Sequence, residues 1–369
     1  MPRTFGPWGM IFSEVHVRKG AVQDAVLAER EAPALADGMV RLAVESFSVT
    51  SNNVTYAVVG DGFGYWDFFP APEGFGIVPM WGHARVIESR CPDIAVGERV
   101  YGYLPMASHL DVRAGKITAS GFADMAEHRQ PMSPIYNQYA RLAADPEHDP
   151  AHEAERMIFG PLFRTGFLIA YFMNANDWFG ASQLVITSAS SKTALGLASA
   201  ARDQSPQIKR IGLTSPSNVS FVEASGLYDQ VVAYDAVGTL AAQPSVSVDF
   251  AGNAGLLGQV HKHLGDSLHY SCLVGATHIE ARSTLGGGSA MPGPKPVLFF
   301  APDHAVALFR ELGPEEATRQ IAAAWQGFLA ATQGSIAITR LHGLGEARRV
   351  FCAMVGGKVD PAQGIVIEP

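Results

Sequence analysis

The chain has 369 residues, of which 47% are apolar and 17% are charged, as is typical of an ordinary globular protein with two domains. Its formal net charge of −8 argues against a surface that binds nucleic acid or an anionic membrane. The three cysteines, Cys91, Cys272 and Cys352, are far apart and predict neither a disulfide framework nor a cysteine-built zinc site. Because the N-terminal sequence also lacks the pattern of a signal peptide, we expect a cytoplasmic protein.

Short strands separated by turn residues are predicted for residues 11–115. Residues 39–49 (MVRLAVESFSV) alternate apolar and polar side chains, and residues 96–104 (VGERVYGYL) resemble a strand that follows a glycine turn. Aromatic residues, proline and glycine gather between Gly60 and Pro79. This composition is typical of a loop packed over the core or of the wall of an apolar pocket.

From about Glu155 the pattern changes to alternating helices and strands. Residues 157–178 have helical periodicity, but their apolar part contains Arg164 and is too short to span a membrane. The next strands and helices are predicted at 184–187, 193–202, 208–214, 217–225, 230–233, 246–250, 254–264 and 270–275. Repeated β-α units predict a doubly wound parallel sheet with helices on both faces. A loop (283–296), a strand (297–301), helix to about 331 and a strand-helix-strand (336–367) complete the chain.

Three segments carry motifs of one enzyme superfamily. Residues 50–62 (TSNNVTYAVVGDG) are similar to an Asn-Pro-Val-Asp-Tyr segment, with its Asn and Tyr kept as Asn52 and Tyr56. Residues 94–102 resemble a Lys-Val-Gly-Asp-Arg-Val turn and strand, and residues 342–367 a Leu-Glu-Glu-Ala helix followed by a Gly-Lys-Val strand. Together they are similar to the medium-chain dehydrogenase/reductase superfamily, most closely to its zinc-independent, quinone-oxidoreductase-like branch.

This resemblance implies an α/β fold with a GroES-like β-rich domain and a Rossmann domain built on a doubly wound parallel sheet. We expect the GroES-like catalytic domain at 1–154, completed by 311–369, and the Rossmann nucleotide-binding domain at 155–310. The resemblance also implies a homodimer. The chain is similar as well to a divergent bacterial subfamily of unassigned function, so the resemblance supports the fold more directly than it supports a substrate.

The turn after the first Rossmann strand lacks the repeated glycines of a dinucleotide-binding loop. A pyrophosphate needs backbone N–H groups at a helix N-terminus, and glycine supplies room but not those groups. Hydroxyl groups and one ammonium group are present instead, on Ser188, Ser190, Ser191, Lys192 and Thr193. We expect these residues to bind the phosphates of the cofactor. The alternative is that the serines only cap the helix and that Lys192 faces solvent.

The end of the second Rossmann strand favours NADP(H) over NAD(H). Residues 208–213 are followed by Thr214, Ser215 and Asn218, with no acidic residue before Glu223. NAD-binding domains usually carry an acid there for the ribose 2′-hydroxyl, whereas neutral donors accept a 2′-phosphate without repulsion. A simple Ser/Pro helix cap is the alternative. By the resemblance, small residues that end the fourth and fifth strands leave space for the nicotinamide, namely Ala251, Gly252, Gly275 and Ala276.

The resemblance also points to three candidate catalytic residues in the first domain. In a metal-free reductase the cofactor supplies the hydride, and the protein supplies orientation and a proton donor. Tyr56 would donate to a developing enolate, Asn52 would hold a carbonyl, and Tyr65 is a nearby substitute for Tyr56. The alternative for each of them is a buried polar side chain with a structural role.

We expect no metal site. His83, in Trp-Gly-His-Ala-Arg (81–85), lacks the Glu and Cys partners of a zinc alcohol dehydrogenase, so we interpret it as structural. His261, His263 and His269 have no carboxylate partners on a clear face except Asp266, and we interpret them as helix surface. Hydrolysis has no support, because no Gly-x-Ser-x-Gly motif is present.

The leading hypothesis is an NADPH-dependent, metal-independent reductase that transfers hydride to an activated C=C or carbonyl of the quinone or enone type. The aromatic segment 63–75 suggests a small, partly hydrophobic substrate, and we expect no nucleic-acid or membrane partner. One alternative is a Rossmann-type binding or regulatory module that has lost hydride chemistry, since a fold does not determine a function. Another is a lyase or isomerase that retains its cofactor.

Overall fold

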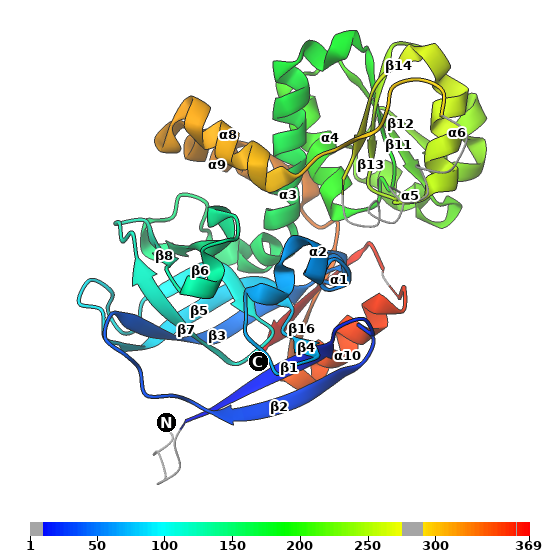
Figure 1. Ribbon diagram of the computed structural model, residues 1–369. Coiled ribbons are helices and arrows are strands. Elements are labelled where there is room, and N and C mark those ends of the chain that lie inside the picture. The colour runs from blue at the N-terminus through cyan, green and yellow to red at the C-terminus, as the bar shows by residue number, and fades with distance from the viewer. Residues whose placement is uncertain (1–9, 275–290, 359) are drawn as a thin grey trace. The chain divides into compact units, whose positions relative to one another are not determined.

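The chain folds into two compact units. The computed structural model describes residues 10–274, 291–358 and 360–369. The first unit, here called the barrel unit, is Met1–Ile158 with Ile338–Pro369, and the second, the sheet unit, is Phe159–Ala337. Antiparallel strands dominate the barrel unit and a parallel sheet with helices forms the sheet unit, which confirms the predicted fold class (Figure 1). The boundaries expected for the functional domains, 154/155 and 310/311, stay predictions.

Six strands of the barrel unit close into an antiparallel barrel. They are β3 (Met39–Val49), β5 (Pro79–Ser89), β6 (Arg99–Pro105), β7 (His109–Gly115), β8 (Gly121–Asp124) and β9 (Gln138–Arg141). Their order is β3-β5-β6-β9-β8-β7, and β7 pairs back with β3 to complete the ring. Strands β17 (Gln363–Glu368) and β16 (Ala337–His342) continue the sheet from β3. The C-terminal segment therefore completes a sheet that the N-terminal segment begins.

A smaller sheet and several helices cover this barrel. The small sheet has the order β2-β1-β4, with β1 (Ile11–Arg18), β2 (Ala25–Glu31) and β4 (Phe75–Gly76). The helices are α1 (Ser51–Val58), α2 (Gly60–Phe63) and α10 (Leu344–Val355), with 3-10 turns η1 (Tyr65–Asp67), η2 (Glu127–Arg129), η3 (Pro134–Asn137), η4 (Leu142–Ala144) and η5 (Pro150–His152). Each of four barrel strands contributes a fully buried side chain, Leu42, Val86, Val100 and Val112. Burial of such side chains is the main favourable contribution to the stability of the unit.

The sheet unit contains six parallel strands. They are β10 (Gln183–Ile186), β11 (Lys209–Thr214), β12 (Gln230–Ala233), β13 (Ser245–Asp249), β14 (Leu268–Leu273) and β15 (Val297–Leu298). Their order, β12-β11-β10-β13-β14-β15, is 3-2-1-4-5-6 in chain order, the arrangement of a Rossmann fold. Between β10 and β13 the direction of winding reverses, and ligands of such sheets bind at the carboxyl ends of the strands at this switch point.

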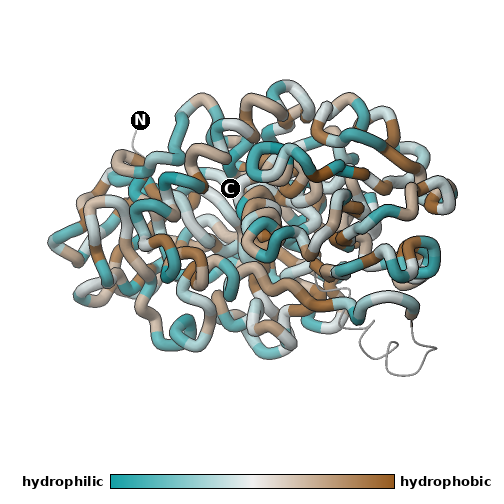
Figure 2. Tube along the Cα trace, turned by 90° about the horizontal axis from the view of Figure 1, so that it is seen from above, coloured by the Kyte–Doolittle hydropathy of each residue, from teal (hydrophilic) through white to brown (hydrophobic). Residues whose placement is uncertain are grey.

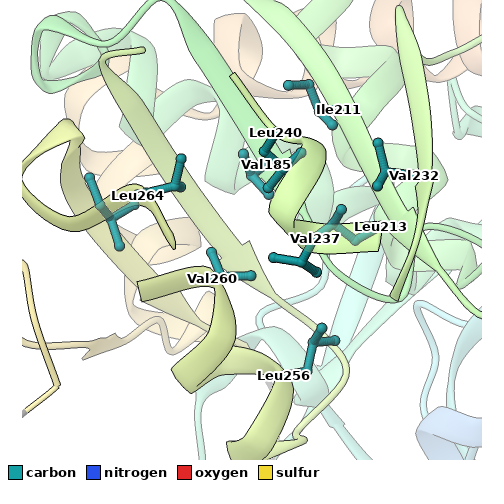
Figure 3. Packing of buried hydrophobic residues seen from close by; sticks show 10 residues of the cluster. Val185, Ile211, Leu213, Val232, Val237, Leu240, Leu256, Val260 and Leu264 are labelled. Carbon is teal, nitrogen blue, oxygen red and sulfur yellow. The ribbon is translucent and has the colours of Figure 1, made fainter. Parts of the chain in front are cut away.

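Helices and 3-10 turns of the sheet unit accompany its parallel strands. They are α3 (Glu153–Ala175), α4 (Lys192–Gln204), α5 (Val219–Ala224), α6 (Ala254–Leu264), α8 (Ala301–Leu312) and α9 (Pro314–Thr332), with turns η6 (Asp177–Gly180), η7 (Pro216–Asn218), η8 (Tyr234–Thr239) and η9 (Gly265–Ser267). Figure 1 shows α4 and α6 on opposite faces of the strands. Leu256 and Val260 of α6 pack with Val185, Ile211 and Leu213 of the sheet in one buried cluster (Figure 3).

The helix that follows β10 is held very close to α3. A Cβ atom added at Gly166 of α3 would lie 2.3 Å from the backbone nitrogen of Leu197, and one added at Gly196 of α4 would lie 2.9 Å from Cα of Phe163. Both distances are shorter than a normal contact. Glycine at these two positions therefore lets the helices cross at backbone distance, which sets where the N-terminus of α4 lies.

No helix within residues 10–274, 291–358 and 360–369 is long and apolar enough to cross a membrane. Figure 2 shows brown, hydrophobic stretches that alternate with teal, hydrophilic ones along the traced chain. This alternation is the pattern expected of strands and helices that bury one face.

The interpretation of three histidines as helix surface is wrong in part. His261 lies on α6 but is fully buried, with Nε2 2.9 Å from Oγ of Ser271 and Nδ1 2.9 Å from the carbonyl oxygen of Pro292. His269 is exposed but belongs to strand β14, and its ring contacts the carbonyl oxygen of Phe179. A buried serine on the neighbouring strand accommodates His261, and sequence periodicity gives no information about such a partner.

Candidate functional site

The switch point of the parallel sheet carries a strand-turn-helix without glycine. Strand β10 ends at Ile186 and α4 begins at Lys192. Ser188 takes the left-handed backbone conformation, φ 50°, that glycine adopts at less cost. The backbone nitrogen of Ser191 donates to the carbonyl oxygen of Ser188 (2.8 Å), and its hydroxyl caps α4 by accepting from the backbone nitrogen of Ala194 (3.3 Å). Serine therefore forms both the turn and the N-cap that present the N-terminus of α4.

A hydrogen bond joins the two turns in which phosphate-binding residues are predicted. The side-chain Nδ2 of Asn218, which follows β11, donates to the hydroxyl of Ser190, which follows β10, over 3.1 Å. Lys192 and Thr193 are half-buried in the first turn of α4. Ser215 lies within the same edge of the sheet, with its hydroxyl 3.2 Å from that of Ser217. The sequence-predicted residues of the first two strand ends thus form one continuous group.

Thr214, the last residue of β11, has a hydroxyl without a protein partner. The side chain is 1% exposed, and Oγ1 makes no hydrogen bond to any residue in the part of the chain that the structure describes. A buried hydroxyl without a partner costs about 1–3 kcal/mol, so such a group is suited to a ligand that supplies the missing bond. Of the cationic residues on the same strand, Lys209 and Arg210 lie at its opposite end, bonded to Gln230 and Asp229.

The remaining predicted cofactor residues lie at the ends of the fourth and fifth strands. Ala251 and Gly252 form the turn after β13 and are half-buried, and Gly252 has φ 65°. Gly275 and Ala276 lie outside the described residues. Two of the four small residues are therefore placed beside the switch point, and the other two stay predictions.

Sequence reasoning missed a buried pair at this point, Thr187 and Asp249. The hydroxyl of Thr187 donates to the carboxylate of Asp249 and accepts from the backbone nitrogens of Phe250 (3.0 Å) and Ala251 (3.1 Å). Thr187 is 1% exposed and Asp249 is fully buried. The pair ties the turn after β10 to the turn after β13. One signal was available in the sequence. Both residues come at the end of a predicted strand, and a 3-2-1-4-5-6 sheet places these two strands side by side.

In the barrel unit, the three predicted catalytic residues lie together. The helix that carries two of them, α1, is fixed against β5 by Asn53. The side chain of Asn53 accepts from the backbone nitrogen of Thr50 (2.7 Å) and donates to the carbonyl oxygen of Pro79 (2.8 Å). On the same helix, Asn52 Nδ2 donates to the hydroxyl oxygen of Tyr56 over 2.7 Å, as side chains four residues apart can. The ring of Tyr65 lies 4.5 Å from that of Tyr56, measured between ring centroids.

Two further tyrosines and a tryptophan surround this group. Tyr56, Tyr65, Tyr103 and Tyr136 are here called the tyrosine cluster. The hydroxyls of Tyr65 and Tyr136 are 3.1 Å apart, and the ring centroids of Tyr103 and Tyr136 are 4.8 Å apart. Trp81 Nε1 donates to the hydroxyl oxygen of Tyr56 over 3.2 Å. Burial raises the pKa of all four phenols, so each is a neutral hydrogen-bond donor at physiological pH.

A buried arginine holds the segment that carries Tyr136. Arg129 is fully buried and donates to the carboxylate of Asp124 (3.0 Å), to Oδ1 of Asn137 (3.0 Å) and to the carbonyl oxygen of Tyr136 (2.7 Å). Its guanidinium also stacks over Phe68, 5.3 Å from the ring centroid. These contacts hold the η2–η3 segment, and hence Tyr136, in place. Nothing in the local sequence around Arg129 marks it as buried.

His83, interpreted as structural, lies inside the barrel unit and is fully buried. Neither ring nitrogen makes a hydrogen bond to a residue of the described chain, and burial lowers the pKa of His83 to about 3. It is therefore neutral at physiological pH. Among the described residues, no group of three or more His, Cys, Asp or Glu side chains is placed to hold a metal ion.

Comparison with known proteins finds one matching family and many similar folds. The model of a family described as "Protein of unknown function (DUF2855)" matches residues 47–360. No curated protein sequence is similar enough to this chain to count as a relative.

Three of the similar solved structures resemble this one over nearly the whole chain. CurA from Vibrio vulnificus in complex with NADPH shares 14% identity at a TM-score of 0.55, with 96% of this chain and 98% of that chain covered. The quinone oxidoreductase from Coxiella burnetii shares 14% identity at a TM-score of 0.55 (98% and 100% covered). The CurF ER cyclopropanase of the curacin A biosynthetic pathway shares 13% identity at a TM-score of 0.57 (97% and 99% covered). At these identities the likeness concerns the fold alone, and it confirms the predicted α/β fold with a β-rich domain and a parallel-sheet domain.

Proposed function

The chain belongs to the family described as "Protein of unknown function (DUF2855)", and from that premise we propose that it is an NADP(H)-dependent, metal-independent reductase. The reductase transfers hydride to an activated C=C or carbonyl of a small, partly hydrophobic substrate of the quinone or enone type. We further propose that the protein works in the cytoplasm as a homodimer.

The observation that carries this proposal is the serine-rich turn at the switch point of a 3-2-1-4-5-6 parallel sheet. A helix N-terminus at this place offers backbone N–H groups to an anionic group. The residues fit the phosphates of a dinucleotide, because hydroxyls and an ammonium line the turn and no acidic residue follows β11 before Glu223. In this proposal Ser188, Ser190, Ser191, Lys192 and Thr193 hold the pyrophosphate.

The buried hydroxyl of Thr214 adds a second reason to expect a nucleotide. With Ser215 and Asn218 it lies at the end of β11, where a Rossmann fold places the adenosine ribose. Neutral donors at this point favour a 2′-phosphate, and hence NADP(H). One of the similar structures, CurA, is a complex with NADPH, which agrees with this choice.

The tyrosine cluster supplies the chemistry that the protein itself must provide. Bound NADPH supplies a hydride. Tyr56 holds its proton up to a high pH because burial raises its pKa, and in the proposed reaction it donates that proton to the enolate or alkoxide oxygen of the reduced substrate. Asn52 orients Tyr56 through their 2.7 Å hydrogen bond, and the surrounding rings exclude water. Tyr65, whose ring packs at a tilt against that of Tyr56 with centroids 4.5 Å apart, is a second neutral phenol beside it.

A titration of the purified protein with NADPH, followed by its tryptophan fluorescence, tests this function. We expect saturable binding, and Lys192→Ala should weaken it about tenfold because one charged phosphate contact is lost. Lys209→Ala is the matched control, since Lys209 is exposed at the other end of β11 and bonded to Gln230. No binding by the wild type at millimolar NADPH would overturn the proposal. Binding without oxidation of NADPH by menadione or an enone would favour a regulatory module instead.

A further inference from the structure

Tyr103 carries a buried hydroxyl at the centre of the tyrosine cluster. It lies on β6 directly opposite Trp81 of β5, so the two side chains share one face of the sheet. Tyr103 is 0% exposed, and its hydroxyl makes no hydrogen bond of normal geometry within the described residues. A buried hydroxyl without a partner costs about 1–3 kcal/mol relative to phenylalanine. Packing alone would therefore favour phenylalanine at this position, and the hydroxyl calls for another explanation.

The polar atom that explains it is the hydroxyl oxygen of Tyr56, with which the Tyr103 hydroxyl interacts. This oxygen already accepts hydrogen bonds from Asn52 Nδ2 (2.7 Å) and from Trp81 Nε1 (3.2 Å). Both groups can only donate, so the proton of Tyr56 must point away from them. The ring of Tyr103 meets that of Tyr56 edge-on, with centroids 5.6 Å apart. Three donors thus lie around one oxygen.

We propose that Tyr103 is a positioning residue that donates a hydrogen bond to the Tyr56 oxygen once Tyr56 has given its own proton to the substrate. The inference rests on the proposed reductase function. In this step the O–H bond of Tyr56 breaks and an O–H bond forms on the enolate or alkoxide oxygen that hydride from NADPH has generated. The electron pair stays on Tyr56, which becomes a phenolate and later regains a proton from solvent.

The three donors match what a phenolate needs. Hydrogen bonds to an ionised oxygen are shorter and about twice as strong as those to a neutral one. Burial raises the pKa of Tyr56, whereas the donors Trp81, Asn52 and Tyr103 lower it. The cluster therefore keeps Tyr56 protonated in the resting protein and offsets part of the cost of its charge during the reaction. The hydroxyl of Tyr103 gains a hydrogen bond of normal geometry only then, which accounts for its burial without one in the resting protein.

The Tyr103→Phe variant separates this role from a structural one. It removes only the hydroxyl, so the free energy of unfolding in urea should stay the same or rise. For NADPH oxidation by menadione, kcat should fall about 10- to 100-fold while KM for NADPH is unchanged, because the lost bond is made to a charged atom. Wild-type kcat in Tyr103→Phe would overturn the proposal.

Tyr139→Phe is the matched control from the same unit. Its buried hydroxyl donates to the carbonyl oxygen of Tyr103 (2.8 Å) and accepts from Arg129 (2.9 Å). Loss of these bonds should lower the free energy of unfolding by a measurable amount but leave kcat within about twofold of the wild type, since neither bond is to a charge that forms in the reaction. If Tyr139→Phe instead lowers kcat as much as Tyr103→Phe, the proposal is wrong.

A second measurement needs no turnover and so distinguishes failure of this inference from failure of the proposed function. Tyr56→Gly leaves a cavity for p-nitrophenol, whose yellow phenolate form reports its ionisation. The three donors predict that bound p-nitrophenol ionises at a lower pH in Tyr56→Gly than in Tyr56→Gly/Tyr103→Phe, by about one pH unit. Equal values would overturn the inference. A wild type that does not oxidise NADPH, together with a Tyr56→Gly variant that binds no p-nitrophenol, would overturn it as well.

Discussion

Thr187 and Asp249 lie 62 residues apart in the chain, yet their side chains share a hydrogen bond at the ends of two neighbouring parallel strands. The hydroxyl of Thr187 is both donor to the carboxylate and acceptor for the backbone nitrogens of Phe250 and Ala251. It therefore holds the turn after β13 in a defined position beside the proposed cofactor site. A substitution that removes this hydroxyl should disturb both folding and cofactor binding.

We expect Thr187→Val to lower the free energy of unfolding by about 3 kcal/mol, because a buried carboxylate loses a donor and two N–H groups lose their acceptor. NADPH affinity should fall about tenfold as the turn at Ala251 loosens. Urea unfolding and fluorescence titration measure the two effects. Thr187→Ser keeps the hydroxyl and should stay within about 1 kcal/mol of the wild type. Equal losses in the Val and Ser variants would show that the hydroxyl is not responsible.

Thr214→Val should weaken NADPH binding without lowering the free energy of unfolding. The hydroxyl of Thr214 is buried without a partner among the described residues, so its removal should leave the free energy of unfolding unchanged or raised. If that hydroxyl binds the adenosine end of NADP(H), affinity for NADPH should still fall about five- to tenfold. Unchanged affinity would remove Thr214 from the site.

The pH dependence of stability should reveal the neutral state of His83. Burial lowers its pKa to about 3 in the folded protein, whereas an unfolded histidine titrates near its ordinary value of about 6.5. Below that value the unfolded state binds the extra proton, so stability rises with pH and is lost as the pH falls from about 6.5 towards 3. The loss should be about 1.4 kcal/mol per pH unit from this residue.

His83→Phe removes the titrating group and should flatten the slope between pH 6.5 and 5, with little change above pH 7. Glu153 acts in a lower window: desolvation raises its pKa, but bonds to Arg99 and His148 outweigh this and lower it to about 2, so its contribution is lost only below about pH 4.5. Chemical denaturation at a series of pH values measures both. A slope that persists in His83→Phe would assign the effect to another group.

The sequence predicted the fold well because strands and helices of a parallel sheet leave local signals. The predicted strand at 230–233 and helix at 254–264 coincide with β12 and α6, and the alternation of strands and helices predicted the doubly wound parallel sheet. The Asn52–Tyr56 contact was foreseeable as well, since both residues lie on one helix face and belong to one motif.

The missed residues share a physical property, which is that their partners are distant in the chain. Trp81 and Tyr103 meet through the register of β5 and β6, and Thr187 meets Asp249 through the order of strands. His261 was misjudged for the same reason, because its partner Ser271 comes from a strand. Burial of a polar side chain depends on such partners, and periodicity within one segment carries no information about them.

A left-handed turn before β10 stores backbone strain. Four consecutive residues have positive φ, namely Asp177 (48°), Trp178 (49°), Phe179 (55°) and Gly180 (73°). Trp178 Nε1 donates to the hydroxyl of Ser205 (2.9 Å), and Phe179 stacks on Tyr270 with centroids 4.2 Å apart, so packing holds the turn in place. Asp177 is exposed, so no packing contact offsets the cost of its left-handed backbone conformation.

Asp177→Gly should therefore raise the free energy of unfolding by up to about 1 kcal/mol, the relief of strain less the added entropy of the unfolded chain. Asp61→Gly is the matched control, since Asp61 is an exposed residue in the first turn of α2. It should lower the stability by about 0.5–1 kcal/mol. Thermal unfolding of the two variants compares them directly, and destabilisation by both would contradict the assignment of strain.

Arg129 is the ion-paired residue whose replacement should matter most for the barrel unit. The side chain of Arg129 is 1% exposed. Its guanidinium bonds at the same time to Asp124, Asn137 and the carbonyl oxygen of Tyr136. Lysine keeps the charge but cannot reproduce this planar set of bonds, so Arg129→Lys should lower the free energy of unfolding by about 3 kcal/mol. Arg90→Lys, at an exposed pair with Asp37, should change it by less than about 0.5 kcal/mol. Urea unfolding measures both, and similar small effects would mean that the buried network relaxes around lysine.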